Sequence, residues 1–223
     1  MTMEIVNSEV KNYLSTLLGN YSGELETLRD YAEKNNHPII PKDVANFLKT
    51  IIHIKKPTQI LEIGTCIGFS SIFMALNTPE NCHITTIEKD EGLIKISQEN
   101  FEKFSVLDKV TLLEGDALEI LSKINTKFDF IFLDAAKGQY INMLPDIIRI
   151  LKIGGILIAD DVLIKGKICV KNQNEVEKRW RTIYNRMCEF LHVMHNTDGL
   201  ESTILPLDDG VLMSVKTKEI SIL

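Results

Sequence analysis

The feature that most constrains the fold is a regular alternation, from residue 59 onward, of short apolar runs with longer segments of helical periodicity. Such an alternation is typical of β-α units, which build a parallel sheet. We expect strands at Gln59–Ile63, His83–Glu88, Lys109–Leu113, Phe128–Asp134 and Gly155–Asp160. We expect helices between them at Phe69–Leu76, Glu91–Phe104, Ala117–Ile124 and Tyr140–Leu151. The alternation therefore predicts an α/β protein with a doubly wound sheet.

The end of the chain follows a different pattern. A long charged segment, Glu175–Val193, is expected to form one helix. Two runs of alternating polarity follow, Ser202–Leu207 and Val211–Lys216, and the turn between them contains Asp-Gly. Because such a turn between alternating runs is typical of a β-hairpin, these runs are expected to pair antiparallel. The prediction is a mostly parallel seven-stranded sheet that ends in an antiparallel hairpin.

The N-terminal part of the chain is predicted to be helical. Apolar residues recur at helical spacing over Val6–Leu18, and further helical stretches are expected at about 23–33 and 43–54. No internal repeat, low-complexity tract or Pro/Gly/Ser linker interrupts the sequence. We therefore expect a single domain over 1–223, with a helical extension at 1–56 and a ligand-binding core at 57–223.

Composition excludes some classes of protein. The chain has 25 basic and 31 acidic residues, a net charge of −6, so no global field draws it onto nucleic acid. Its four cysteines lack metal-ligand spacing, and we interpret them as buried thiols in a reducing compartment: Cys66, Cys82, Cys169 and Cys188. We expect neither a signal peptide nor a membrane span, because the first residues lack a basic-then-apolar pattern and no apolar run approaches ~20 residues. A cytoplasmic protein without a membrane partner is expected.

The first expected strand leads into a turn with a specific glycine spacing. A dinucleotide-binding fingerprint needs glycines at i, i+2 and i+5, but the positions that follow Gly64 in this way are Cys66 and Phe69. A nicotinamide oxidoreductase is therefore disfavoured. The pattern from Glu62 to Gly68, Glu-x-Gly-x-x-x-Gly, instead resembles the first motif of the S-adenosylmethionine-dependent methyltransferases. A glycine at position 64 lets the backbone approach a cofactor with no Cβ between them.

Polar residues at the other strand ends suit the same cofactor. Glu88 lies 24 positions after Gly64, where a carboxylate can accept both hydroxyl donors of a ribose. Asp116 is a candidate for the adenine amine, for capping the helix that starts at Ala117, or for both. Glu62 orients either the turn or the methionine amine, and Ser70 is either a cofactor contact or simply a residue of the first helical turn.

Three carboxylates follow two further apolar runs. Asp134 ends one run, and Asp160 and Asp161 end the next. Because the carboxyl ends of adjacent parallel strands meet at one edge of a sheet, these groups are expected to converge and to repel one another unless a cation lies between them. Hard oxygen ligands suit Mg²⁺ or a similar divalent ion. We therefore predict a metal site of these three aspartates.

A lysine and a tyrosine follow the first of these aspartates. The pattern Asp-x-x-Lys-x-x-Tyr, at Asp134, Lys137 and Tyr140, resembles the metal-dependent catechol and caffeoyl-CoA O-methyltransferases. The resemblance implies that Asp134 binds the metal and that Lys137 helps to take the proton of the acceptor hydroxyl. Beside a dication the pKa of Lys137 is expected to be lowered. The family usually has Asp-Asn where this chain has Asp160-Asp161, so Asp161 is the least secure ligand.

The resemblance extends over nearly the whole chain and is greatest to the bacterial tRNA 5-hydroxyuridine methyltransferases. The matching pieces are Tyr31–Glu33 with Pro38-Ile39, Leu61–Thr65, Asp134–Tyr140, Asp160–Gly166 and Ile204–Gly210. It implies S-adenosylmethionine as cofactor, a homodimer, and a set of cofactor-binding residues: Ile40, Glu62, Gly64, Thr65, Ser70, Glu88, Asp116, Ala117, Asp134 and Tyr140.

The expected acceptor is 5-hydroxyuridine at the tRNA wobble position, whose O5 and O4 can chelate a metal as a catechol does. A cationic segment after Asp161 favours RNA: Lys165, Lys167, Lys171, Lys178, Arg179, Arg181 and Arg186. A solvated helix face is the alternative interpretation of this segment. The alternative activity is methylation of small catechols, and a protein that binds without catalysis is the alternative of another class. His192 and His195 are expected to be core or surface residues.

Overall fold

The structure, a computed structural model, describes residues 5–21, 23–170 and 173–220. The seven strands of the described residues belong to one sheet. The chain divides into two compact units, one of residues 8–120 and one made of the remainder. Each unit carries its own part of the predicted site, so each is described by itself.

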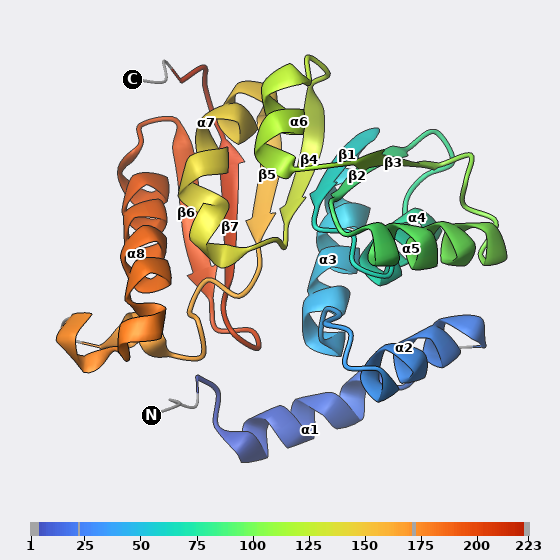
Figure 1. The fold of residues 1–223 in the computed structure, drawn as a ribbon, viewed down its shortest axis with the longest axis horizontal. Helices are drawn as coiled ribbons and strands as arrows, with labels where there is room; N and C mark the ends of the chain where they lie inside the picture. The colour runs from blue at the N-terminus through green and yellow to red at the C-terminus, as the bar shows by residue number, and fades with distance from the viewer. Residues whose placement is uncertain (1–4, 22, 171–172, 221–223) are drawn as a thin grey trace. The chain divides into compact units, whose positions relative to one another are not determined.

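The unit of residues 8–120 contains strands β1 to β3 and the helices α1 to α5 (Figure 1). Its strands are β1 (Gln59–Ile63), β2 (His83–Glu88) and β3 (Val110–Glu114), ordered β3-β2-β1 and parallel throughout. The helices are α1 (Ser8–Leu18), α2 (Glu24–Lys34), α3 (Lys42–Lys55), α4 (Phe69–Asn77) and α5 (Glu91–Lys103), followed by the start of α6 (Ala117–Lys123).

The N-terminal helices differ in what they bury. Helix α3 buries one apolar face, which includes Val44, Leu48 and Ile52, and it ends where Lys56 turns into the left-handed region. Helix α1 has no buried residue and exposes Tyr13 and Leu17. The three helices are confirmed, and the homodimer expected from their apolar faces stays a prediction.

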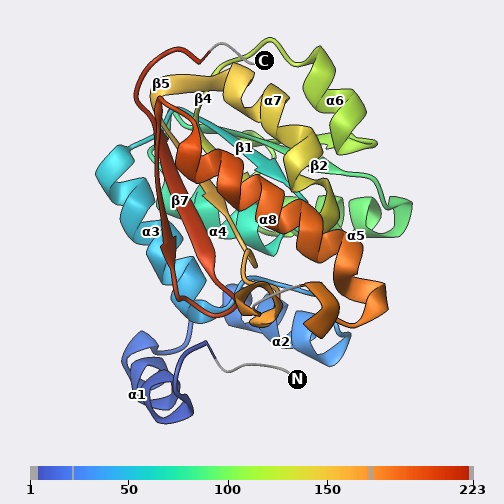
Figure 2. The ribbon, with the colours of Figure 1, turned by 90° about the vertical axis from the view of Figure 1, so that its left-hand side faces the viewer.

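The second unit contains the other four strands. They are β4 (Phe128–Leu133), β5 (Leu151–Ala159), β6 (Leu200–Leu205) and β7 (Val211–Lys216), ordered β4-β5-β7-β6. The β4–β5 pair is parallel, whereas β7 pairs antiparallel with both β5 and β6. Helices α7 (Tyr140–Ile150) and α8 (Arg181–Asn196) pack against each other on one face of these strands (Figure 2). The mostly parallel sheet with a C-terminal hairpin is therefore confirmed.

Two expected boundaries in this unit are wrong. Strand β5 begins at Leu151 rather than at residue 155, because Leu151 already pairs with Phe128 before an irregularity in the register. The expected helix from Glu175 does not form over its first turns, because Glu177 is extended (φ −53°, ψ 139°). Short 3₁₀ turns occupy Lys167–Cys169, Gln173–Glu175 and Lys178–Trp180 instead, and α8 begins at Arg181.

Other expectations concern individual cysteines and histidines. Of the four cysteines only Cys82 is buried, and Cys169 is exposed, so the expectation of four buried thiols is wrong. His192 and His195 are exposed on α8, as the surface interpretation predicts. Within the described ranges, no helix is long and apolar enough to cross a bilayer.

Candidate functional site

The glycine-spaced turn between β1 and α4 needs its glycines for conformational reasons. Gly64 and Gly68 have φ values of 105° and 85°, in the region that favours glycine. The amides of Gly64 and Thr65 donate to the carbonyl oxygen of Ile87, at 3.1 and 3.2 Å. A Cβ on Gly68 would lie 2.6 Å from the ring of Phe101. The turn is thus hydrogen-bonded to β2, and at Gly68 it packs against Phe101 of α5.

Glu62 orients this turn from inside the β1–β2 pair. It is fully buried, and its Oε2 accepts a hydrogen bond from the Thr86 hydroxyl (2.6 Å) and one from Ser71. Thr86 in turn accepts from the Thr65 hydroxyl at 2.6 Å. The register places Glu62 opposite Thr86, a pairing that only the strand alignment reveals. Of the two roles predicted for Glu62, the structure supports orientation of the turn.

Glu88, at the end of β2, faces the same turn. Its Oε2 accepts from the Cys66 amide at 2.9 Å, and its Oε1 accepts from the amides of Lys89 (2.9 Å) and Asp90 (3.1 Å). A carboxylate offers about four acceptor positions, so these three bonds set its orientation and leave capacity for a ligand hydroxyl. By this count the carboxylate can still accept one of the two predicted ribose hydroxyls, and the ribose contact itself stays a prediction.

The remaining predicted cofactor residues of this unit lie at two helix starts. Asp116 is exposed and its Oδ1 accepts from the Leu118 amide at 2.9 Å, so the predicted capping role is confirmed. Ala117 begins α6. Ser70 is buried in the first turn of α4. Their contacts with a cofactor stay predictions.

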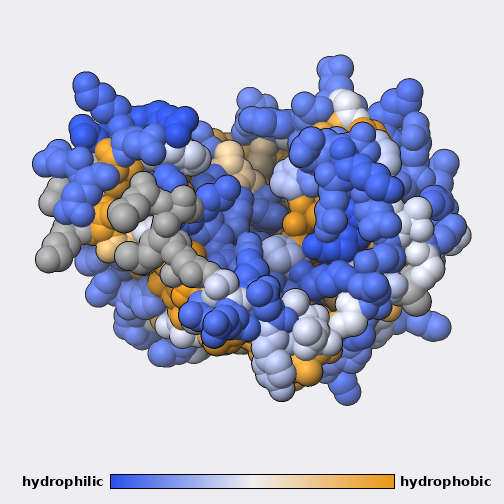
Figure 3. All heavy atoms as spheres, turned by 90° about the horizontal axis from the view of Figure 1, so that it is seen from below, coloured by the Kyte–Doolittle hydropathy of each residue, from blue (hydrophilic) through white to orange (hydrophobic). Residues whose placement is uncertain are grey.

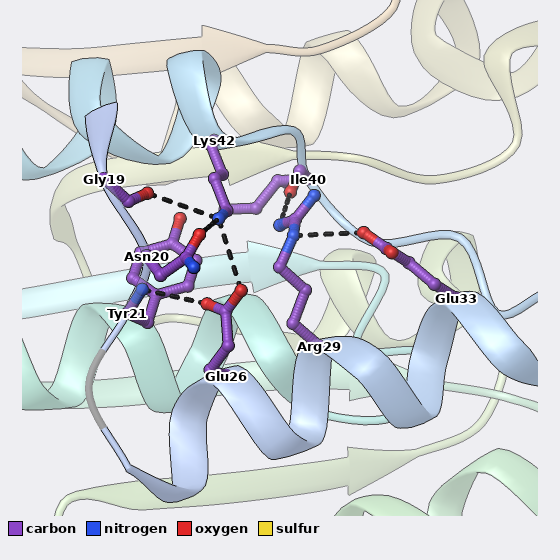
Figure 4. Close-up of polar contacts among 8 residues, drawn as sticks. All are labelled: Gly19, Asn20, Tyr21, Glu26, Arg29, Glu33, Ile40 and Lys42. Carbon is purple, nitrogen blue, oxygen red and sulfur yellow. Dashed lines mark hydrogen bonds and ion pairs between the residues drawn. The ribbon is translucent and has the colours of Figure 1, made fainter. Parts of the chain in front are cut away.

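Ile40 lies in the connection between α2 and α3 (Figure 4). Its side chain is 2% exposed, and its carbonyl oxygen accepts from Nη1 of Arg29 at 3.1 Å. Nearby, Lys42 donates to Asn20 Oδ1 (2.7 Å) and to Glu26 Oε1 (3.3 Å). These bonds tie the segment before α2 to both helices and hold Ile40 in place.

The second group of predicted residues lies at the carboxyl ends of β4 and β5. Nζ of Lys137 is 3.1 Å from Oδ1 of Asp134 and 2.7 Å from Oδ2 of Asp161. Oδ1 of Asp160 accepts from the Asp161 amide at 2.8 Å. The three carboxylates do gather at one edge, and the ammonium group of Lys137 bridges two of them.

Tyr140 braces the two strand ends beneath this cluster. It is fully buried, and its hydroxyl lies 3.1 Å from the carbonyl oxygens of both Leu133 and Asp160. Its ring packs edge-on against Phe190 of α8, with centroids 5.5 Å apart. A hydroxyl engaged in this way positions Asp134 and Asp160, while the predicted contact of Tyr140 with the cofactor stays a prediction.

Burial and charge crowding shift the pKa values in the cluster. Burial, followed by the charges of Asp134 and Asp161, raises the pKa of Asp160 to about 8. Burial also raises the pKa of Asp134, against the opposing effect of Lys137. Burial lowers the pKa of Lys137, but the two carboxylates raise it by more, so the amine stays protonated. The expectation of a lowered pKa for Lys137 assumed a dication beside the amine. With only the two carboxylates beside it, its pKa is raised.

The donor set fits a divalent cation in its chemistry. Among the residues that the structure describes, no three His, Cys, Asp or Glu side chains stand in a ready metal-binding arrangement. However, Asp134 and Asp161 already direct oxygens toward one point, the Lys137 Nζ. Asp160 carries a carboxyl whose ionisation needs a further positive charge nearby. The cluster thus has the hard oxygen donors and the excess negative charge that a dication requires.

Sequence reasoning missed the residues that connect α8 to the cluster. Nη1 of Arg186 donates to the Gly138 carbonyl at 2.9 Å, directly after Lys137. Trp180 is the one tryptophan of the chain. The centre of its ring lies 5.0 Å from Nζ of Lys167 and 5.9 Å from the guanidinium group of Arg179. The basic residues were visible in the sequence, but their division into structural and exposed cations depends on the fold.

The chain belongs to the O-methyltransferase family, whose sequence profile matches residues 18–217. A caffeoyl-CoA O-methyltransferase of Populus kitakamiensis is 28% identical over 205 residues, which are 86% of this chain and 87% of that protein. A catechol O-methyltransferase of Niastella koreensis is 28% identical over 184 residues, 80% of this chain and 83% of that protein.

Solved structures agree with this assignment. A Staphylococcus aureus protein, provisionally described as a caffeoyl-CoA O-methyltransferase, has a TM-score of 0.86 and 30% identity, covering 94% of this chain and all of its own. The Podospora anserina methyltransferase PaMTH1, solved with S-adenosylhomocysteine bound, has the same fold (TM-score 0.83, 24% identity, 96% and 97% covered). The protein is therefore an S-adenosylmethionine-dependent O-methyltransferase similar to the caffeoyl-CoA and catechol enzymes.

Proposed function

We propose that the chain transfers a methyl group from S-adenosylmethionine to 5-hydroxyuridine at the tRNA wobble position, with the help of a divalent cation. The observation that carries the metal-dependent chemistry is the convergence of Asp134 and Asp161 on Lys137. The acceptor has two adjacent oxygens, O5 and O4, which can share one cation. The methyl donor is assigned to the residues around the β1–α4 turn, above all Gly64 and Glu88.

Each residue of the acidic cluster has a defined task in this proposal. The cation would be held by Asp134, Asp160 and Asp161. We expect Mg²⁺ because all three residues offer hard oxygen donors. When bound, the cation lowers the pKa of the acceptor hydroxyl and orients its oxygen toward the methyl group. Lys137 holds its proton while the carboxylates face it. With Asp134 and Asp161 turned to a bound cation, the pKa of Lys137 would fall and its ammonium group would release a proton to solvent, and the neutral amine would then accept the proton of the acceptor hydroxyl.

Removal of divalent cations tests the metal-dependent chemistry. We expect EDTA to reduce methyl transfer by at least about 100-fold, because the acceptor hydroxyl then keeps its normal pKa. Mg²⁺ added in excess of EDTA should restore the rate, and Mg²⁺ alone should raise the melting temperature of the wild-type protein. Release of S-adenosylhomocysteine measures the reaction. Turnover that is undiminished after all divalents are removed would contradict the proposal.

The basic segment after β5 supports RNA as the acceptor, though with fewer cations than the sequence suggested. Arg181 donates to the Val176 carbonyl at 3.1 Å and Arg186 to the Gly138 carbonyl, so both have structural partners. Lys171 lies outside the described residues. The exposed cations are Lys165, Lys178 and Arg179, the last also paired with Glu177.

An aromatic ring among cations strengthens the RNA proposal. Trp180 ends the last 3₁₀ turn, directly before α8, and its ring lies beside Lys167 and Arg179. Cations that contact phosphates next to a ring that can stack on a base are typical of single-stranded RNA sites. The face seen in Figure 3 is mostly hydrophilic, with hydrophobic side chains in small separate patches. These features favour a polar macromolecular substrate.

Charge reversal distinguishes an RNA substrate from a small one. The double variant Lys178→Glu with Arg179→Glu should lower kcat/KM for tRNA by at least about 10-fold and reduce its salt dependence, because two phosphate contacts are lost. Activity on a catechol should change by less than about two-fold, since two exposed surface charges contribute little to the binding of a small neutral acceptor. The matched control reverses two exposed lysines elsewhere, Lys49 and Lys103. Equal loss with both substrates would contradict an RNA-binding role.

Methylation of small catechols is the second candidate function. It is favoured by the similarity to the catechol O-methyltransferase of Niastella koreensis. The same acidic cluster would bind both catechol oxygens through the cation. Full activity on a catechol, together with no activity on tRNA that carries 5-hydroxyuridine, would select this candidate.

A further inference from the structure

The loop that follows β5 has an unusual backbone. Asp161, Ile164 and Lys165 have φ values of 57°, 50° and 52°, and Gly166 has 73°. The left-handed region is unfavourable for residues with a Cβ, and it is rarest for β-branched residues such as isoleucine. Residues held in such conformations persist only where the surrounding structure determines them. We call residues 161–166 the β5 loop.

The turn between β6 and β7 supplies that constraint. The amide of Val162 donates to the Gly210 carbonyl and that of Leu163 to the Asp209 carbonyl, both at 2.9 Å. The side chain of Asp209 adds a third bond, in which its Oδ1 accepts from the Lys165 amide. Asp209 therefore holds the β5 loop at two points, once through its backbone and once through its carboxylate.

Side-chain packing also joins the β6–β7 turn to the β5 loop. A Cβ on Gly210 would lie 2.3 Å from Cγ of Leu163, so the hairpin turn and the β5 loop are in direct contact. Val162 is fully buried and Ile164 is 6% exposed, and both anchor the loop in the unit. Burial raises the pKa of Asp209 to about 6 and its bond from Lys165 opposes that shift, as expected for a half-buried acceptor.

The β5 loop begins at a residue of the acidic cluster. Asp161 provides the Oδ2 that lies 2.7 Å from Lys137, and its amide donates to Asp160 at 2.8 Å. The left-handed conformation of Asp161 lets its amide and its side chain face the cluster together. A loop released from the hairpin would return toward ordinary φ values and carry the Asp161 carboxylate away from Lys137.

We propose that Asp209 is a positioning residue for the methyl-transfer reaction, and that the β6–β7 turn clamps the β5 loop so that the Asp161 carboxylate stays within the acidic cluster beside Asp160 and Lys137. The proposal goes beyond the metal and acceptor assignments, and it rests on the proposed function only for the importance of Asp161. The clamp itself can be measured without any substrate. Asp209 touches neither reacting group, so its effect on the reaction passes through the loop.

The test compares three variants. In Asp209→Ala the acceptor for the Lys165 amide is lost, in Asp209→Asn an Oδ1 acceptor remains, and Glu201→Gln removes an exposed charge from β6 of the same hairpin. Hydrogen exchange of the peptide that covers residues 161–169 reports the clamp. Values of kcat and of KM for S-adenosylmethionine report the positioning, measured with Mg²⁺ and with whichever acceptor the wild type methylates, tRNA that carries 5-hydroxyuridine or a catechol.

We expect Asp209→Ala to accelerate exchange of the loop roughly 10-fold, because its opening costs less free energy. The same variant should lower kcat about 10- to 100-fold, as for other groups displaced by about 1 Å, with KM for S-adenosylmethionine changed by less than about two-fold. Asp209→Asn should recover both values to within about three-fold, since it keeps the acceptor. Glu201→Gln should behave as the wild type.

Three results would overturn the proposal. Unchanged exchange in Asp209→Ala would show that the carboxylate does not hold the loop. Faster exchange with an unchanged kcat would show that the clamp exists but does not position Asp161 for the reaction. An Asp209→Asn variant as impaired as Asp209→Ala would assign the effect to charge rather than to the hydrogen bond. If the wild type methylates neither a catechol nor tRNA, the proposed function fails and so does the positioning role, while the exchange data still decide whether the clamp exists.

Discussion

Replacement of Lys137 by alanine is expected to lower kcat by about 10²- to 10⁴-fold, the usual contribution of a general acid–base group. Lys137 lies 3.1 Å from Asp134 and 2.7 Å from Asp161, and among the described residues no other basic side chain forms an ion pair with these two carboxylates. Without it the acceptor hydroxyl has no positioned base. Release of S-adenosylhomocysteine with saturating acceptor and Mg²⁺ measures the effect.

Lys152→Ala is the matched control for this variant. Lys152 forms a similar ion pair with Asp129 (2.9 Å) in the same unit, away from the cluster. It should keep kcat within about two-fold, because a surface ion pair contributes at most about 1 kcal/mol to stability. Lys137→Ala with a wild-type kcat and a normal melting temperature would exclude Lys137 as the proton acceptor.

The variant Asp160→Asn is expected to be more stable than the wild type above pH 4, by an amount that grows between pH 4 and pH 8. The pKa of Asp160 is about 8 in the folded chain, against about 4 in an unfolded one. Below pH 4 the carboxyl is protonated in both states and costs nothing. Between pH 4 and 8 the unfolded chain releases the proton while the folded chain keeps it, so the wild type loses stability. Asparagine has no such proton to release.

The gap should therefore open between pH 4 and 8 and stay level above pH 8. Its size at pH 8 is on the order of 2–5 kcal/mol, from about 1.4 kcal/mol per pKa unit discounted for charge coupling. For a chain of this length that corresponds to a melting temperature raised by about 5–15 °C, measured without divalent cations. Asp198→Asn, at an exposed residue paired with Lys218, is the control and should change the melting temperature by less than about 4 °C. A gap that does not change with pH would contradict the raised pKa.

The fold was accessible from the sequence because it depends on local patterns. Apolar runs of strand length alternate along the chain with segments of helical periodicity. The Asp209-Gly210 turn between the last two runs predicts the hairpin. One expected boundary failed where a nonlocal contact decides it, because Leu151 joins β5 by pairing with Phe128. The other failed because the backbone is extended at Glu177, so the segment before Arg181 is not helical. The charged pattern of that segment did not indicate this break.

The sequence by itself determined the chemical types at the site: a glycine turn, acceptor carboxylates at strand ends, and a lysine three residues after Asp134. Only the tertiary structure decided how these groups are arranged and charged. Thr86 meets Glu62 through strand register, and Asp209 reaches the Lys165 amide across 44 positions of the chain. Burial and neighbouring charges, which set the pKa of Asp160, are likewise properties of the folded chain. Residue types follow from sequence, whereas hydrogen-bond partners and local electrostatics arise when distant segments pack together.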